Sequence, residues 1–414
     1  MFSRLLGHPV AAIVILSIVL RSAVLAGGGP VFDDLDNYLP MARSLVSGEG
    51  FALGGRLTAY RPPLYPLLLI PAVGLGRWTS WGIAALHLGL GAGMVAMTAA
   101  AATRLGLSRR RAMAAALIVA CDPVLIWQSR SVMTETPAAF LVAAMLAGLS
   151  IGGRRGAILG GIASGLAGLC RPSLLAASTL TIAAGLVATP GHWRERLTRS
   201  TILAATTAIV LLPWMVRNLV AIGEPIWTTT HGGYTLALAN NEVYYREILD
   251  GPPGRVWTGD DQWHWWDSVT RKTIGLTEPE ADRFLRNQAM EIARRRPLDF
   301  VRASIARLGR FWAVAPSEAV YPRPARFATM IWTIPLWTAL LLGVLRRPAW
   351  SWPTIAATMT LLGLTIVHLA FWTDLRMRAP IVPAIAILAA GAGARSDENR
   401  RGWDQVRLGS MGSR

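Results

Sequence analysis

Long apolar runs alternate with short polar connections along most of the chain. A helix needs about 20 mostly apolar residues to cross a bilayer. We find ten runs of roughly this length and one shorter run. They cover 9–26, 63–76, 82–103, 111–128, 136–152, 156–170, 173–189, 200–216, 327–345, 352–372 and 379–394. The pattern predicts an all-α polytopic membrane protein.

The run at 63–76 differs from the others because it is short and rich in proline. It begins at Pro62-Pro63 and also contains Pro66 and Pro71. Proline removes a backbone donor and kinks a helix interior. We expect this segment to be a re-entrant or interfacial helix, which leaves about ten crossings.

Arginines are concentrated in every second connection. Short cytoplasmic loops carry an excess of positive residues, so these connections indicate the cytoplasmic side. The clusters are Arg4, Arg104 with Arg109–Arg111, Arg154 with Arg155, Arg194 with Arg196 and Arg199, Arg346 with Arg347, and Arg395 with Arg400 and Arg401. Ten crossings place all of them on one side, with both termini cytoplasmic. A cleaved signal peptide over 1–26 is the alternative, but Arg21 interrupts its apolar region.

Two long connections, 27–81 and 217–326, fall on the outer side. The second contains Thr277-Glu278-Pro279-Glu280, a capping box that predicts a helix to about Arg296. Leu298, Val301, Ile305, Leu308 and Trp312 then follow at helical spacing, which predicts an amphipathic helix on the outer membrane face. A cluster of Trp263, Trp265 and Trp266 is typical of a membrane interface.

These boundaries divide the chain into four parts. Residues 1–216 form an N-terminal transmembrane module that includes the outer loop 27–81 with interfacial helices. Residues 217–326 form a small outer segment, and 327–394 form the C-terminal membrane helices. The polar tail 395–414 is expected to be cytoplasmic and disordered.

Composition supports a membrane protein and limits the other classes. Of 414 residues, 53% are hydrophobic and only 16% are charged, and the net charge is +17. A basic excess favours nucleic acid or membranes as partners, and the apolar runs decide for the membrane. Cys121 and Cys170 lie inside apolar runs and have no metal-ligand spacing, so we expect neither a disulfide framework nor a metal site, and no cofactor.

Three carboxylates follow the first apolar run: Asp33, Asp34 and Asp36. Carboxylates this close repel each other, and one of them has a raised pKa unless cations lie nearby. A solvated acidic loop is the plain alternative. Residues 35–46 then read as a short helix with Tyr38 on its apolar face.

Arginines and one glutamate lie at the other outer ends of the runs. Tyr60-Arg61 precedes a rigid proline pair, and Glu135 opens the run at 136–152. The remaining outer arginines are Arg171, Arg217, Arg376 and Arg378. Each also has a purely structural explanation. An arginine at a helix end can extend its charge to the membrane interface, and a glutamate is favoured in a first helical turn. Together they predict a carboxylate cluster facing a ring of arginines, suited to a lipid-linked anion.

The order of these motifs resembles a known family. The motifs are Asp34…Tyr38, Ala42-Arg43-Ser44-Leu45, Gly48-Glu49-Gly50, Arg61-Pro62-Pro63-Leu64-Tyr65-Pro66, Met133-Thr134-Glu135-Thr136, Leu169-Cys170-Arg171-Pro172, Pro213-Trp214, Arg217-Asn218, Gly232-Gly233-Tyr234, Asn240-Asn241 and Arg376-Met377-Arg378-Ala379-Pro380. The set is similar to the bacterial C-type glycosyltransferases related to protein O-mannosyltransferases and to the lipid A aminoarabinose transferase.

The resemblance implies a multi-span enzyme of the cell envelope that takes sugar from a polyprenyl phosphate with inversion. By position, Asp34 matches the catalytic aspartate, while Arg61 and Arg217 match cations for the lipid phosphate. Glu135 matches the second-loop acid. Leu35 replaces the second acid of the usual pair, so Asp33 or Asp36 is expected to supply that charge. The resemblance extends the donor phosphate set and the substrate pocket to further residues. These are Tyr60, Arg376 and Arg378 for the phosphate, and Tyr38, Tyr65, Arg171, Tyr234 and Asn240 for the pocket.

The sequence therefore predicts an enzyme of the bacterial inner membrane whose site faces the extracytoplasmic side. Its partners are a polyprenyl-phosphate sugar, a lipid, glycan or protein acceptor, and the bilayer, without nucleic acid. A transporter or flippase of an anionic lipid-linked sugar is the rival class. Such a protein favours internal repeats and charges at the bilayer midplane, and neither is visible in the sequence.

Overall fold

The structure is a computed structural model that describes residues 8–27, 34–251, 257, 260–317 and 323–393. Two sequence expectations therefore fall outside the described residues: the position of Asp33 and the state of the tail 395–414.

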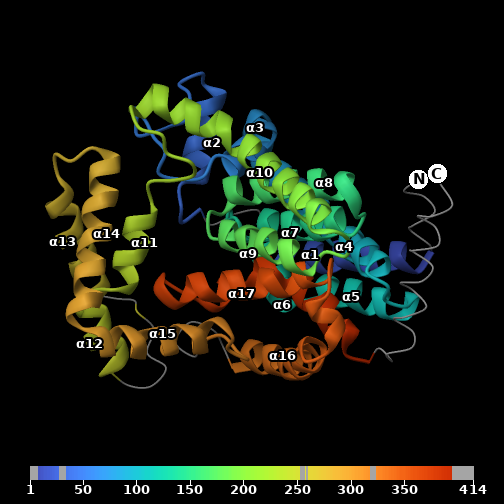
Figure 1. Cartoon of the computed structure of the whole chain (residues 1–414). Coiled ribbons are helices and arrows are strands. Elements are labelled where there is room, and N and C mark those ends of the chain that lie inside the picture. Colours follow the sequence, from blue (N-terminus) through green and yellow to red (C-terminus); the bar gives the residue numbers. More distant parts are fainter. Residues whose placement is uncertain (1–7, 28–33, 252–256, 258–259, 318–322, 394–414) are drawn as a thin grey trace.

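Helices make up nearly all of the described chain (Figure 1). The N-terminal half contains α1 (His8–Gly27), α2 (Tyr38–Val46), α3 (Leu64–Gly74), α4 (Thr79–Arg104), α5 (Arg109–Cys121), α6 (Pro123–Gln128), α7 (Glu135–Leu149), α8 (Gly153–Cys170), α9 (Leu174–Ala188) and α10 (Trp193–Ile222). The C-terminal half contains α11 (Gly232–Ala239), α12 (Glu242–Leu249), α13 (Asp260–Thr273), α14 (Glu278–Arg295), α15 (Pro297–Phe311), α16 (Arg323–Val344), α17 (Ile355–Ala370) and α18 (Val382–Ala390). Short 3-10 helices are η2 (Gly76–Trp78), η3 (Arg347–Trp350), η4 (Leu375–Ile381) and η5 (Gly391–Gly393). The predicted all-α class is confirmed.

One small hairpin interrupts the helices in the first outer segment. Strand β1 (Ala52–Leu53) pairs antiparallel with β2 (Arg56–Leu57). Gly54 and Gly55 form the turn with φ of 59° and 76°. Two consecutive positive φ angles are the geometry of a tight hairpin turn, which explains the glycine pair.

Four described helices are long and apolar enough to cross a membrane by length and composition: Pro9–Gly27, Gly76–Arg104, Trp193–Ile222 and Arg323–Val344. Four shorter apolar helices accompany them: Leu64–Gly74, Glu135–Leu149, Leu174–Ala188 and Ile355–Ala370. The chain is a membrane protein. The number of about ten crossings stays a prediction, and the short α3 agrees with the expected interfacial helix.

The apolar run at 111–128 forms two helices instead of the single one that we expected. Helix α5 ends at Cys121, and the Asp122 carboxylate accepts a hydrogen bond from Leu125 N at 2.9 Å to cap α6. Arg21 of α1 donates to the carbonyls of Val119 and Ala120 at 3.4 and 3.2 Å. A helix end leaves its last carbonyls unpaired. Arg21 therefore satisfies the end of α5, and this buried contact explains the charge inside the first apolar run.

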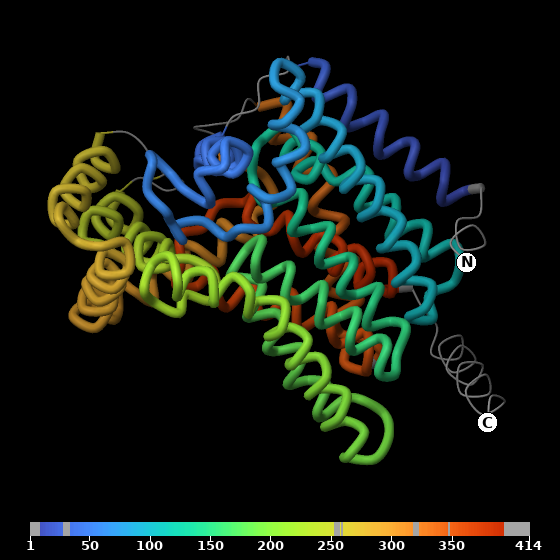
Figure 2. The backbone as a smooth tube through the Cα atoms, turned by 90° about the horizontal axis from the view of Figure 1, so that it is seen from above, coloured from blue at the N-terminus to red at the C-terminus, as the bar shows by residue number. Residues whose placement is uncertain are grey.

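The helices form a bundle with an outer layer on one side. Helix α8 packs between α7 and α10, α4 packs on α7, and α9 packs on α17. Helices α11 to α14 gather beside this bundle, and α15 leads back to α16 (Figure 1). Viewed from above, α1 and α4 run side by side along one edge (Figure 2).

The outer segment 217–326 contains both predicted helices. Helix α14 starts at the capping box, where Thr277 N donates to a Glu280 oxygen at 2.8 Å. Helix α15 buries Ala303, Arg307 and Phe311 and leaves an apolar row exposed: Leu298, Val301, Ile305 and Leu308. The helix is confirmed, and its place on the membrane face stays a prediction.

The tryptophan cluster on α13 divides between two environments. Trp263 and Trp266 are exposed, as an interface position requires. Trp265 is buried and contacts the rings of Trp257 and Tyr234. The expected interfacial role for all three residues is therefore corrected for Trp265, because its ring belongs to the core of the outer segment.

Candidate functional site

Asp34 lies at the N-terminus of α2. Its two carboxylate oxygens accept hydrogen bonds from Tyr38 N at 3.0 Å and Leu39 N at 2.7 Å. Asn37 precedes the helix in the left-handed region, with φ of 61°, and so turns the chain into it. The first N–H groups of a helix lack intrahelical partners, so a carboxylate is held there firmly.

Asp36 and Arg61 form an ion pair beside this cap. Arg61 donates to Asp36 Oδ1 at 2.8 Å and to the Asp36 carbonyl at 3.1 Å. The guanidinium also lies 5.8 Å from the ring centre of Tyr38 and 5.2 Å from that of Tyr60. Two rings and the Asp36 carboxylate therefore hold this cation in place.

The two aspartates have different surroundings. Asp36 is neutralised by Arg61, whereas Asp34 has no ion-pair partner within the described part of the chain. Burial raises the pKa of Asp34, the N–H groups of Leu39 and Tyr38 oppose that effect, and the charge of Asp36 adds to it. The raised pKa makes Asp34 a stronger base than an ordinary aspartate.

Glu278, the first residue of α14, ties the two outer segments together. One carboxylate oxygen accepts from Ala59 N at 2.8 Å and from the Thr230 hydroxyl, and the other accepts from the Thr58 hydroxyl at 2.6 Å. Thr230 N also donates to the Ala59 carbonyl at 3.0 Å. The segment 58–60, which leads from β2 into Arg61, is therefore held by a residue more than 200 positions away. The sequence showed Glu278 only as part of a helix start.

His231 belongs to an aromatic group beside Arg61. Its ring stacks on Tyr234 at 5.0 Å and meets Tyr60 edge-on at 4.4 Å. Burial and the charge of Arg61 lower the pKa of His231 well below its ordinary value, so the ring is neutral. Helix α11 approaches α14 closely here: a Cβ on Gly233 would lie 1.9 Å from the Asp282 carbonyl oxygen. This contact explains the glycine in the motif and fixes the place of Tyr234.

Glu135 forms a second, buried charge cluster. Its side chain is 1% exposed and lies 3.2 Å from Arg171 and 3.5 Å from Arg376. The charge of Asp36 and the Tyr38 hydroxyl lie within electrostatic reach of Arg376. The two clusters are therefore neighbours in the structure, and their shared role in a site stays a prediction.

Three of the predicted residues do not gather with these clusters. Arg217 donates to the carbonyls of Thr58 and Phe51 at 2.7 and 2.8 Å, so it holds the first outer segment. Arg378 donates to the Ala313 carbonyl and faces Trp337. Asn240 donates to the Ala370 carbonyl at 2.7 Å. The roles of these three residues in binding stay predictions. Tyr65, another predicted pocket residue, is fully buried and its ring contacts that of Tyr38.

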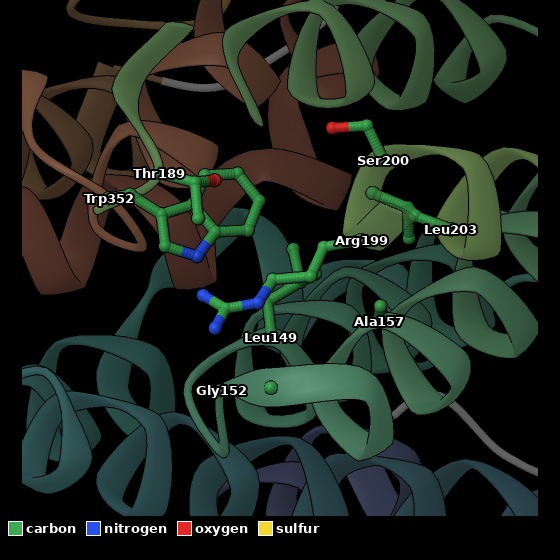
Figure 3. A pocket seen from close by; sticks show the side chains of 9 residues that line it. Leu149, Gly152, Ala157, Thr189, Arg199, Ser200, Leu203 and Trp352 are labelled. Carbon is green, nitrogen blue, oxygen red and sulfur yellow. The ribbon is translucent and has the colours of Figure 1, made fainter. Parts of the chain in front are cut away.

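A small pocket lies at the far end of α7 from Glu135 (Figure 3). Its walls include Leu149, Thr189, Arg199, Leu203 and Trp352, close to the arginine-rich connections. It shares no residue with the two charge clusters. Among the described residues, no group of three or more His, Cys, Asp or Glu side chains is placed to hold a metal ion.

Comparison with known proteins agrees with this architecture. Residues 44–222 match the sequence model of the family described as dolichyl-phosphate-mannose-protein mannosyltransferase. This range holds Arg61, Glu135, Arg171 and Arg217, and it begins after the Asp34 motif. A comparison with curated protein sequences finds no match.

Solved structures resemble the whole chain. ArnT from Cupriavidus metallidurans in the apo state aligns with a TM-score of 0.53 at 15% identity, over 97% of this chain and 62% of that one. The oligosaccharyltransferase of Archaeoglobus fulgidus, tethered to an acceptor peptide, aligns with a TM-score of 0.53 at 14% identity, over 92% and 49%. The AglB oligosaccharyltransferase of the same organism, in complex with an inhibitory peptide and a dolichol-phosphate, gives 0.53 at 12%, over 97% and 54%.

The fold therefore resembles that of ArnT and of the archaeal oligosaccharyltransferases. The family model and the structural matches confirm the resemblance that the ordered motifs indicated. The chain spans about half to three fifths of the length of these solved structures.

Proposed function

We propose that the protein is a membrane glycosyltransferase that moves a sugar from a polyprenyl phosphate to an acceptor hydroxyl. The observation that carries the proposal is the pairing of an uncompensated base with fixed cations. Asp34 has a raised pKa and no ion-pair partner in the described chain, and Arg61 pairs with Asp36, two residues further along the same segment. The family model over 44–222 and the dolichol-phosphate in the AglB complex support a lipid phosphate as the leaving group.

The reaction is a single displacement at the anomeric carbon. The acceptor oxygen forms a bond to that carbon as the bond to the phosphate oxygen breaks, which inverts the configuration. The hydroxyl proton passes to Asp34, which as general base contributes roughly 10²–10⁴-fold. The phosphate leaves with growing negative charge, and Arg61 and Arg376 stabilise it with preorganised guanidinium groups. Tyr38 and Tyr60 hold Arg61 in place, and Tyr234 lines the same side.

The arginine-rich connections support an extracytoplasmic site in the bacterial inner membrane, with both termini cytoplasmic. The acceptor is a lipid, a glycan or a protein hydroxyl that reaches Asp34 from the outer side. Glu135 orients the Arg376 guanidinium through its ion pair.

The decisive experiment is transfer in proteoliposomes with a panel of labelled polyprenyl-phosphate sugars. We expect one donor to release free polyprenyl phosphate as the label appears on the acceptor. Asp34→Asn should lower turnover by roughly 10²–10⁴-fold while the protein stays folded. Movement of an intact donor between leaflets without cleavage, or normal transfer by Asp33→Asn, Asp34→Asn and Asp36→Asn alike, would refute the proposal.

A further inference from the structure

A buried histidine–tyrosine pair lies directly beneath the candidate site. His87 of α4 and Tyr65 of α3 are both fully buried, and the Tyr65 hydroxyl lies 2.8 Å from His87 Nε2. On the other side of the ring, His87 Nδ1 lies 2.8 Å from the Ser129 carbonyl oxygen. Neither residue touches a reacting group in the mechanism above.

The chemistry of these partners fixes the direction of both hydrogen bonds. A carbonyl oxygen only accepts, so His87 Nδ1 carries the hydrogen and donates to Ser129. In a neutral imidazole the other nitrogen then accepts, so the Tyr65 hydroxyl donates to Nε2. The acceptor on His87 thus fixes the position of the Tyr65 hydroxyl.

The oriented ring supports the residue on which the site is built. Tyr65 meets the ring of Tyr38 in an edge-to-face arrangement, with centroids 5.2 Å apart and planes at 72°. Tyr38 in turn donates its backbone N–H to Asp34 and carries the guanidinium of Arg61 on its ring. A rotation of Tyr65 would therefore move both the base and the cation.

We propose that His87 is a positioning residue for the transfer site, acting through Tyr65 on Tyr38. The proposal rests on the proposed function. Buried and bonded on both sides, His87 holds the hydroxyl end of Tyr65 in place, and Tyr65 packs on Tyr38, whose backbone N–H is bonded to Asp34. Small displacements of such groups lower turnover because the transition state, more than the bound donor, depends on alignment.

Two substitutions separate the contacts of His87. His87→Asn keeps a donor toward the Ser129 carbonyl but is too short to reach Tyr65, and Tyr65→Phe removes the hydroxyl alone. We expect each to lower kcat by roughly 10- to 100-fold, with the donor KM changed far less. Because both break the same hydrogen bond, the double variant should be no slower than the slower single one. His87→Gln, whose amide oxygen can accept from Tyr65, should retain more activity than His87→Asn.

Thr98→Val is the matched control, since Thr98 is also buried on α4 and its hydroxyl bonds only within the helix, to the Met94 carbonyl at 2.8 Å. Thermal unfolding of all variants in the same detergent compares their stability. Additive losses in the double variant, unchanged kcat in His87→Asn, or an equal loss in Thr98→Val would overturn the proposal.

Hydrogen exchange distinguishes this proposal from the proposed function. His87→Asn should speed the exchange of amides in residues 38–46, while Thr98→Val should leave them at the wild-type rate. If the wild-type protein transfers no sugar from the panel, the proposed transfer function is refuted. The exchange comparison still tests whether His87 positions α2. Equal exchange in the two variants would then show that His87 does not position α2.

Discussion

The carboxylate of Asp36 lies 2.8 Å from Arg61, while that of Asp34, two residues earlier, is bound only by backbone N–H groups in the described chain. The ion pair ties Asp36 to Arg61, while Asp34 keeps only backbone partners in the described chain. Similar residues in one loop thus acquire different surroundings.

Asp36→Asn should therefore act on the donor more than on the chemical step. Without the carboxylate, Arg61 loses its ion pair but keeps both rings. We expect a donor KM changed by about tenfold or less, an interaction of about 1.4 kcal/mol, and a turnover far above that of Asp34→Asn. Steady-state kinetics of the two variants in parallel check this. A complete loss in Asp36→Asn with normal transfer in Asp34→Asn would exchange their roles.

The acid limb of the pH–rate profile should report Asp34. A general base acts when ionised, so turnover falls as the pH drops through its pKa, which is raised above the ordinary 3.8. The charge of Asp36 contributes to that rise. In Asp36→Asn the acid limb should accordingly move to lower pH. A shift to higher pH in that variant would contradict the assignment.

Glu135→Gln should destabilise the protein. The change leaves Arg171 and Arg376 facing a neutral amide in a buried site, and breaking a buried ion pair costs about 3–5 kcal/mol. A second change, Arg171→Gln, should restore part of the loss. Glu195→Gln is the control, because its pair with Arg199 is exposed and such pairs contribute about 0–1 kcal/mol. Thermal unfolding in detergent measures all of these, and an equal shift in the control would contradict the prediction.

Glu278→Ala should weaken donor binding from a distance. The change removes two hydrogen bonds to the segment 58–60, which leads into Arg61, and a third to Thr230. We expect an affinity for the lipid phosphate roughly tenfold lower, equal to about 1.4 kcal/mol, with Glu278→Gln closer to wild type. Glu280→Ala provides the control, since Glu280 caps the same helix through Thr277 and not through the segment 58–60. Equal losses in the two alanine variants would show that only the helix start matters.

Cysteine labelling in intact cells should confirm the orientation. Arg56→Cys and Lys272→Cys lie at exposed positions of the two outer segments, and Arg110→Cys and Arg194→Cys lie at exposed positions of the basic connections. An impermeant reagent should label the first two variants only. Labelling of Arg110→Cys without permeabilisation would reverse the topology.

Local patterns in the sequence predicted much of the fold. Thr277 and Glu280 mark the start of α14 because a capping box depends on neighbouring residues alone. The amphipathic spacing from Leu298 likewise predicts α15. The break at Asp122 escaped because the surrounding run is apolar throughout, and only Arg21, about 100 residues away, satisfies the end of α5.

The candidate site was predicted in part for the same reason. The order of motifs placed Asp34, Arg61 and Glu135 on one side, since all lie at the ends of apolar runs. The contact of Glu278 with Ala59 joins positions 219 residues apart, and no local pattern records it. The role of Arg217 could not be predicted from its position either. An arginine at a helix end can bind a ligand or backbone carbonyls, and Arg217 binds the carbonyls of Thr58 and Phe51.

The contact between Arg21 and the end of α5 has a consequence for biosynthesis. During translation α1 is made long before α5, so Arg21 first has only its partners on Ser17 within its own helix. Its bonds to the carbonyls of Val119 and Ala120 form only after the chain through Cys121 has emerged from the ribosome.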